Sequence, residues 1–178
     1  MLRHYRRGGL VARLVKDRYW GLRPECSRSF REWQLLVDLY GQGLPVPRPV
    51  AARVSQGLLT YRADILTEKI AHTTTLAESL KESQLAAEIW EGIGGSIRRL
   101  HDVNCFHADL NAMNILLGHQ HEAYLIDFDR ARYRASGPWK AANLERLQRS
   151  LLKLSRLNPG FNFSSRDWKS LLSGYYQA

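Results

Sequence analysis

Two short acidic segments in the second half of the sequence carry residue types that could do chemistry together. The first, His107–Asn114, reads H-A-D-L-N-A-M-N, and the second, Ile126–Asp129, reads I-D-F-D. Phosphoryl transfer needs little covalent help from a protein and much positioning: one carboxylate accepts a hydroxyl proton, while an amide and a second carboxylate hold Mg²⁺. Asp109, Asn114 and Asp127 are groups of these three kinds, so the pattern predicts phosphoryl-transfer chemistry.

The elements around these segments would bring them to one place. Ile115–Leu117 and Tyr124–Ile126 read as a short hairpin around a polar turn, which would put Asn114 and Asp127 at the same end. Apolar residues at helical spacing from Leu76 to His101 predict one or two helices that lead into the first segment, with glycines weakening the middle. Residues 140–157 and 164–176 predict two closing helices, the second started by Ser164 or Ser165.

The first seventy residues predict a small antiparallel sheet and one helix. Residues 2–7 and 10–16 read as strands that meet at Gly8 and Gly9, and Val50–Val54 and Leu58–Leu66 read as two more. Ser27 or Ser29 can cap a helix that runs to about Tyr40. Strands and helices together predict an α+β fold class.

The pattern H-x-D-L-x-x-x-N-I-L followed by I-D-F-D is similar to that of bacterial small-molecule and lipopolysaccharide kinases. Nearly the whole chain resembles one family among them, the kinases of 3-deoxy-D-manno-octulosonic acid (Kdo). The segments that carry the resemblance are Arg3–Leu10, Ser29–Glu32, Gly43–Ala52 and His107–Asn111.

The resemblance implies a single protein-kinase-like domain over residues 1–178 with a two-lobe fold. Residues 1–66 would form a partial N-lobe with a truncated small sheet, 67–70 the hinge, and 71–178 a mainly helical C-lobe. In one respect the sequence departs from the family: the glycine-rich hairpin that covers the nucleotide phosphates is missing, because Met1 comes immediately before the strand that should bear the phosphate-binding lysine.

The resemblance also implies roles for residues in the two acidic segments. Asp109 would be the catalytic base, and Asn114 and Asp127 would bind Mg²⁺. His107 would belong to the catalytic loop, where a structural role that ties the metal-binding turn in place is favoured over direct chemistry. Asp129 stands where protein kinases usually carry glycine; a supporting role and a solvated carboxylate remain equally open.

Four further residues would bind ATP if the resemblance holds. Arg3 fills the position of the phosphate-binding lysine, and Glu32 is its natural ion-pair partner; the alternative is an exposed strand arginine and a Glu32 paired with Arg28. Glu68 and Ile70 lie where the chain would cross between lobes and where backbone groups usually hold adenine.

The charge of the chain bears on its partners. The net charge is +9, and residues 1–31 alone carry about +7, which attracts polyanions or an anionic leaflet. No window approaches the roughly 18 apolar residues that a membrane span needs. With this charge, the resemblance implies a peripheral protein at the cytoplasmic face of the inner membrane that acts on the acidic glycolipid Kdo-lipid A, with no nucleic acid and no protein partner implied. The arginines of Asp129–Arg134 could meet an acidic substrate or form a solvated loop.

Two function classes remain open on the sequence. The leading hypothesis is an ATP-dependent kinase of the Kdo 4-hydroxyl; another small-molecule phosphotransferase is the alternative within that class, although cationic substrates fit a basic chain poorly. The second hypothesis is a catalytically impaired kinase-like binding module, or a fragment, because the glycine-rich loop is absent. A nucleic-acid-binding protein rests on charge alone and leaves the acidic segments unexplained.

Overall fold

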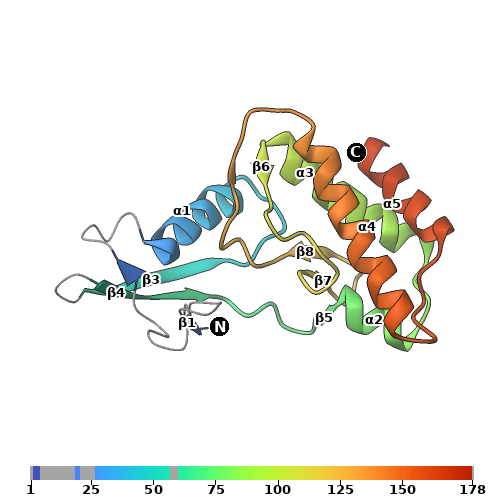
Figure 1. Ribbon diagram of the computed structural model, residues 1–178, viewed down its shortest axis with the longest axis horizontal. Coiled ribbons are helices and arrows are strands. Elements are labelled where there is room, and N and C mark those ends of the chain that lie inside the picture. The colour runs from blue at the N-terminus through green and yellow to red at the C-terminus, as the bar shows by residue number, and fades with distance from the viewer. Residues whose placement is uncertain (1, 5–18, 21–26, 57–59, 178) are drawn as a thin grey trace. The chain divides into compact units, whose positions relative to one another are not determined.

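The computed structural model describes residues 2–4, 19–20, 27–56 and 60–177 (Figure 1). It combines helices with small antiparallel sheets, which confirms the α+β class. The chain divides into two compact units: unit 1 comprises Met1–Gln42 and Pro47–Lys69, and unit 2 comprises Gly43–Val46 and Ile70–Ala178. The lobe and hinge boundaries stay a prediction.

Unit 1 is a small sheet covered by one helix. β3 (Pro49–Gln56) and β4 (Thr60–Thr67) pair antiparallel, and β1 (Leu2–His4) and β2 (Tyr19–Trp20) pair with the other edge of β4. The predicted strand over residues 10–16, and residues 5–7 of the strand before it, lie outside the described residues.

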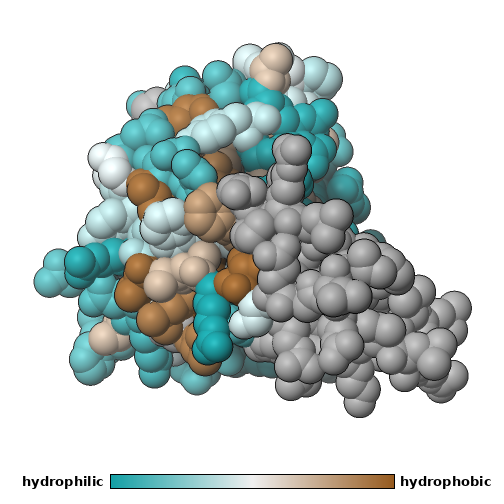
Figure 2. Space-filling model, turned by 90° about the vertical axis from the view of Figure 1, so that its left-hand side faces the viewer, coloured by the Kyte–Doolittle hydropathy of each residue, from teal (hydrophilic) through white to brown (hydrophobic). Residues whose placement is uncertain are grey.

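Helix α1 (Arg28–Gly41) packs on β3 and β4 and confirms the helix predicted from its periodicity. Its first turn is capped by Ser27, whose Oγ accepts the Phe30 N–H at 3.3 Å. Leu36 and Leu39 are buried on the helix, and Ala63 and Ile65 are buried on β4. Figure 2 shows a face of the molecule on which apolar side chains, in brown, lie exposed among hydrophilic ones. Unit 1 has the exposed apolar residues Val37 and Val50.

Unit 2 holds the remaining helices, α2 (Leu76–Glu82), α3 (Ala87–Asp102), α4 (Trp139–Leu157) and α5 (Ser165–Gln177). The break between α2 and α3 falls at residues 83–86, so α3 runs unbroken through its glycines. A Thr75–Glu78 capping box starts α2, and a reciprocal pair of hydrogen bonds between Ser164 and Asp167 starts α5.

Two small sheets complete unit 2. In the first, β7 (Ile115–Leu117) pairs with β8 (Ala123–Leu125), which confirms the predicted hairpin, and β5 (Thr74–Thr75) lies on the other edge of β7. In the second, β6 (Cys105–Phe106) pairs with β9 (Arg132–Tyr133). The sequence did not predict β5, β6 or β9, because strands of two residues carry too few side chains to show alternation.

The core of unit 2 is centred on α3, which buries Ile89, Trp90, Ile93, Ile97 and Leu100; each such side chain contributes roughly 1.5–3 kcal/mol. Helices α3 and α5 lie side by side (Figure 1) and meet through glycines. A Cβ at Gly94 would lie 2.0 Å from the Leu171 carbonyl oxygen, and one at Gly174 would lie 2.1 Å from that of Glu91. These glycines therefore serve close packing of the two helices.

Across the described ranges, none of the helices combines the length and the apolar character that crossing a membrane requires.

Candidate active site

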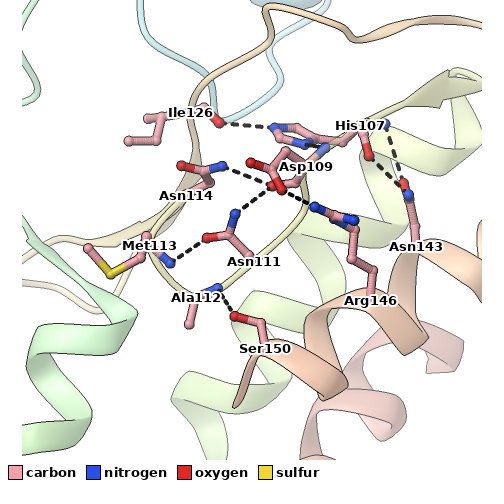
Figure 3. Close-up of polar contacts among 10 residues, drawn as sticks. All are labelled: His107, Asp109, Asn111, Ala112, Met113, Asn114, Ile126, Asn143, Arg146 and Ser150. Atoms are coloured by element: carbon pink, nitrogen blue, oxygen red, sulfur yellow. Dashed lines mark hydrogen bonds and ion pairs between the residues drawn. The ribbon is translucent and has the colours of Figure 1, made fainter. Parts of the chain in front are cut away.

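The 107–114 loop follows β6 directly and is anchored by a buried histidine. The His107 side chain has no exposed surface; its Nε2 donates to the Ile126 carbonyl oxygen at 2.9 Å, and its Nδ1 accepts the Asp109 N–H at 3.2 Å (Figure 3). One ring nitrogen donates and the other accepts, so the imidazole is neutral. Burial lowers the pKa of His107, although the Ile126 carbonyl opposes that shift. His107 thus joins the loop to the segment after β8.

Two asparagines fold the loop around the Asp109 backbone. The Asp109 carbonyl oxygen accepts from Nδ2 of Asn111 at 3.0 Å and from Nδ2 of Asn114 at 2.9 Å, and Asn111 Oδ1 accepts the Met113 N–H at 2.8 Å. Because the Asn114 amide nitrogen is turned toward Asp109, its Oδ1 points away from that residue (Figure 3). This oxygen is the atom of Asn114 that a cation would bind.

Asp127 follows the β7–β8 hairpin at the end where Asn114 lies. The Ile126 N–H donates to the Asn114 carbonyl oxygen at 3.0 Å and so extends the ladder by one step beyond the Ile115–Leu125 pair. Asp127 comes next, with φ of 65° and an exposed side chain. A residue other than glycine in this left-handed region costs free energy, and such strain concentrates at functional sites.

Asp109 and Asp127 line one cavity of about 380 Å³, which the structure places entirely within unit 2. Its lining residues are Ala108, Asp109, Asp127, Asp129, Arg130 and Arg146. Next to Asp127, Phe128 is buried, and its ring centroid lies 4.9 Å from that of His107, so Phe128 packs against the histidine that anchors the loop. The two predicted carboxylates are therefore brought together around a space that can hold a ligand.

Helix α4 supports the loop through one stripe of polar residues that the sequence analysis missed. Asn143 accepts the His107 N–H and donates to the His107 carbonyl oxygen, Arg146 donates to the Asp109 carboxylate, and Ser150 Oγ accepts the Ala112 N–H (Figure 3). Positions 143, 146 and 150 fall on one helix face. Each of these polar positions is adjacent in sequence to one of the buried residues Leu144, Leu147 and Leu151. That spacing could have indicated that the polar residues face other segments of unit 2.

Arg146 stabilises the ionised form of Asp109. Partial burial would raise the pKa of the Asp109 carboxyl, but the hydrogen bond from Arg146 and its positive charge outweigh that effect and hold the pKa below its ordinary value. Asp109 is therefore ionised at neutral pH, the state that a proton acceptor requires.

Replacing Arg146 by glutamine should lower kcat by about tenfold, because hydrogen bonds to charged groups contribute about 1.5 kcal/mol or more. The acid limb of the pH–rate profile should move to higher pH, since the pKa of Asp109 would no longer be held down. Phosphate transfer measured from pH 8 down to the acid limb of the wild type checks both effects. Arg149→Gln is the matched control, because Arg149 lies on the same helix and pairs with Glu145 instead. An acid limb that stays in place in the Arg146 variant would contradict this role.

A buried chain of hydrogen bonds links the loop to α3 and α5. His101 is fully buried; its Nδ1 accepts the Tyr175 hydroxyl at 2.8 Å, and its Nε2 donates to Asn143 Oδ1 at 3.4 Å. Burial lowers the pKa of His101 to about 4, which the hydrogen bond with Asn143 only partly offsets. His101, like His107, is neutral in the folded protein.

Acidification should therefore destabilise the protein before its carboxylates titrate. Unfolded histidine has a pKa of about 6.5, so below that pH the unfolded chain binds a proton that folded His101 does not. The stabilisation is complete above pH 6.5 and declines as pH falls toward 4; by pH 5 the loss is about 2 kcal/mol for His101 alone. Urea unfolding followed by tryptophan fluorescence between pH 7.5 and 5 measures it.

A matched pair of variants isolates the His101 contribution to this pH dependence. His101→Gln should flatten the dependence, while His119→Gln, at an exposed histidine, should leave it unchanged. Equal slopes in wild type and His101→Gln would refute the assignment.

The donor set at this end of the hairpin fits magnesium bound together with phosphates: Asp127 lines the cavity, and Asn114 lies beside it in the ladder. Within the described residues no three His, Cys, Asp or Glu side chains form a metal-binding group. Asp127 and Asn114 offer one carboxylate and one amide oxygen, and Mg²⁺ is typically held by one or two carboxylates plus substrate phosphates and water. These two residues could therefore supply part of a Mg²⁺ site whose remaining ligands are nucleotide phosphates and water.

The nucleotide contacts predicted for unit 1 involve Arg3, Glu32 and Glu68. Arg3 pairs with Ile65 through the β1–β4 register, but its side chain lies outside the described residues. Glu32 is buried on α1, with 4% of its surface exposed. The Glu68 N–H donates to the Arg48 carbonyl oxygen at 2.9 Å, and its exposed carboxylate lies 3.5 Å from the Arg48 guanidinium.

Ile70, the first residue of unit 2 after Lys69, accepts the Thr73 hydroxyl through its carbonyl oxygen at 3.0 Å. The adenine contacts predicted for Glu68 and Ile70 stay predictions.

A loop with an ionised aspartate and a neighbouring amide and carboxylate is the type of site that a phosphotransferase has. Comparison with known proteins identifies the family. The model of the lipopolysaccharide kinase (Kdo/WaaP) family matches residues 1–175, and the chain belongs to this family.

Curated relatives carry the name 3-deoxy-D-manno-octulosonic acid kinase. One from Actinobacillus succinogenes is 47% identical over 178 residues, covering 98% of this chain and 74% of the relative. One from Haemophilus influenzae is 47% identical, covering 99% and 75%. One from Vibrio vulnificus is 43% identical, covering 98% and 73%.

Proposed function

We propose that the protein is an ATP-dependent kinase that phosphorylates the 4-hydroxyl of a Kdo sugar on Kdo-lipid A during synthesis of the lipopolysaccharide inner core. The family and the name of its relatives support a phosphotransferase that acts on a sugar hydroxyl. The structural observation that carries the proposal is that Asp109 and Asp127, thirteen residues beyond Asn114, line one cavity.

In this proposal Asp109 accepts the proton of the acceptor hydroxyl. The hydroxyl oxygen of the sugar attacks the γ-phosphorus of ATP as the bond from that phosphorus to the leaving ADP oxygen breaks. Arg146 keeps Asp109 ionised and fixes its orientation. Asn114 and Asp127 would hold Mg²⁺, which neutralises charge on the β- and γ-phosphates when bound. His107 acts by holding the loop and takes no proton, because both ring nitrogens are engaged.

The nucleotide would also be held by residues of the first seventy positions. By resemblance to protein kinases, Arg3 contacts the α- and β-phosphates, Glu32 orients Arg3, and backbone groups near Glu68 and Ile70 bind adenine. This assignment carries with it a two-lobe arrangement with a hinge at 67–70. The burial of Glu32 supports a paired rather than a solvated carboxylate.

Location follows from the acceptor. A glycolipid with carboxylates and phosphates lies in an anionic leaflet, and a chain with a net charge of +9 is attracted to it. We therefore propose peripheral attachment to the cytoplasmic face of the inner membrane. The relatives' shared name favours this kinase over a binding module and over other small-molecule phosphotransferases.

The test is transfer of the terminal phosphate of Mg-ATP to purified Kdo-lipid A, with lipid A lacking Kdo and a cationic aminoglycoside as alternative acceptors. Mass spectrometry detects the product, and NMR locates the phosphate on the sugar. Phosphorylation of Kdo-lipid A at the 4-hydroxyl, and of neither control, supports the proposal. Phosphorylation of another acceptor in its place refutes it.

A further inference from the structure

Three arginines follow the second acidic segment at alternate positions: Arg130, Arg132 and Arg134, here called the arginine strip. We propose that the arginine strip binds the anionic groups of the acceptor, with Arg130 binding the carboxylate of the sugar that receives the phosphate. This inference rests on the proposed function and assigns the part of the site that selects the acceptor.

Arg130 is placed in the cavity by a tight turn. The Ala131 N–H donates to the Phe128 carbonyl oxygen at 2.9 Å, which reverses the chain just after Asp127. Arg130 then lines the same cavity as Asp109. A group bound by Arg130 is therefore a near neighbour of the acceptor hydroxyl that Asp109 would engage.

Arg132, on β9, and Arg134, just after β9, extend the strip. The β6–β9 register sets Arg132 opposite Phe106, the residue before His107, and the Arg134 N–H donates to the Asn104 carbonyl oxygen. Both guanidinium groups lie over the Phe106 ring, 5.4 Å and 4.9 Å from its centroid. Stacking orders these side chains, and both residues are exposed, so their N–H groups stay accessible to an anion.

The arginine strip carries three positive charges. Among the described residues no carboxylate forms an ion pair with Arg130, Arg132 or Arg134, whereas Arg48, Arg98, Arg146 and Arg149 each have a carboxylate partner. From Ala131 to Leu144 the sequence contains no acidic residue. The strip therefore presents concentrated positive charge that a ligand can neutralise.

The composition of the cavity explains why an acidic acceptor needs such a group. Asp109, Asp127 and Asp129 line the cavity, so a sugar that brings its own carboxylate would be repelled. Arg146 is committed to Asp109, which leaves Arg130 as the described cation in the cavity lining able to pair with the ligand. Arginine also suits a carboxylate because its planar fork can donate two parallel hydrogen bonds.

The experiment separates acceptor binding from nucleotide binding. Full-length wild type, Arg130→Gln and the double variant Arg132→Gln/Arg134→Gln are assayed with Kdo-lipid A at saturating Mg-ATP, and then with varied ATP. Arg149→Gln is the control, since it removes one exposed positive charge from α4. Each variant is also assayed with an acceptor whose sugar carboxylates are methyl-esterified.

For Arg130→Gln we expect the KM for Kdo-lipid A to rise by roughly tenfold or more, with the KM for ATP unchanged. For wild type, the acceptor KM should rise by a similar factor when the sugar carboxylates are esterified. For Arg130→Gln, esterification should cause no further rise in the acceptor KM. The double variant should raise the acceptor KM by a smaller factor, and the control should match wild type.

Two results would overturn this inference and leave the proposed function standing. One is an unchanged acceptor KM in Arg130→Gln while wild type phosphorylates Kdo-lipid A. The other is a rise in the KM for ATP instead of the KM for the acceptor. If wild type does not phosphorylate Kdo-lipid A, the proposed function fails, and the acceptor site with it.

Discussion

Asp109→Asn should reduce kcat for phosphate transfer by about 10²–10⁴-fold, because an amide cannot accept the proton of the acceptor hydroxyl. The loop should keep its shape, since its anchors are the His107 ring and the Asp109 backbone groups rather than the carboxylate. Asparagine has nearly the same shape and retains an oxygen that can accept from Arg146.

Initial rates with Kdo-lipid A, together with the dissociation constant of ATP from calorimetry, distinguish a chemical effect from a structural one. The dissociation constant and the unfolding midpoint should match those of wild type while kcat falls. Arg149→Gln again serves as the comparison, because Arg149 lies on α4 and pairs with Glu145 instead of with the loop. An Asp109→Asn enzyme with a kcat near that of wild type would rule out Asp109 as the base.

Asp127→Asn should be the second severe substitution, with a loss of about 10³-fold in kcat/KM. A metal ion at the transferred phosphate supplies several kcal/mol of charge stabilisation, and about 1.4 kcal/mol corresponds to each factor of ten. Asparagine is the informative replacement because it tolerates the positive φ of 65° at this position, so the backbone is preserved while the charge is removed.

The expected signature of Asp127→Asn is a shift in metal dependence. The Mg²⁺ concentration for half-maximal rate should increase, and electron paramagnetic resonance should show weaker binding of Mn²⁺ in the presence of a non-hydrolysable ATP analogue. Asp129→Asn removes the same charge from the same cavity and should affect metal dependence much less. Equal metal dependence in wild type and Asp127→Asn would remove Asp127 from the metal site.

The candidate catalytic and metal-binding residues were easier to predict from the sequence than the residues that hold them in place. Asp109, Asn114 and Asp127 stand in a short pattern whose spacing reflects one local loop and one hairpin, and the structure contains both. Helices α1, α3, α4 and α5 were predictable from apolar periodicity and from the capping residues Ser27 and Ser164.

The supporting contacts could not be predicted because they join segments far apart in the chain. Arg146 meets Asp109 across 37 residues, and Asn143 meets His107 across 36. On α4 both look like ordinary polar residues of an exposed helix face. The pairing of β9 with β6 likewise depends on tertiary structure, which is why Asp129–Arg134 could be read either as a solvated loop or as a binding element.

The glycine contact between α3 and α5 has a consequence for how the protein is made. His101 and Tyr175 are bonded across 74 residues, and the two helices approach closely at Gly94 and Gly174. Chains emerge from the ribosome at about 5–20 residues per second, so α3 and the 107–114 loop spend several seconds without this partner. During synthesis, the loop gains its final support only after the chain has been extended through Tyr175.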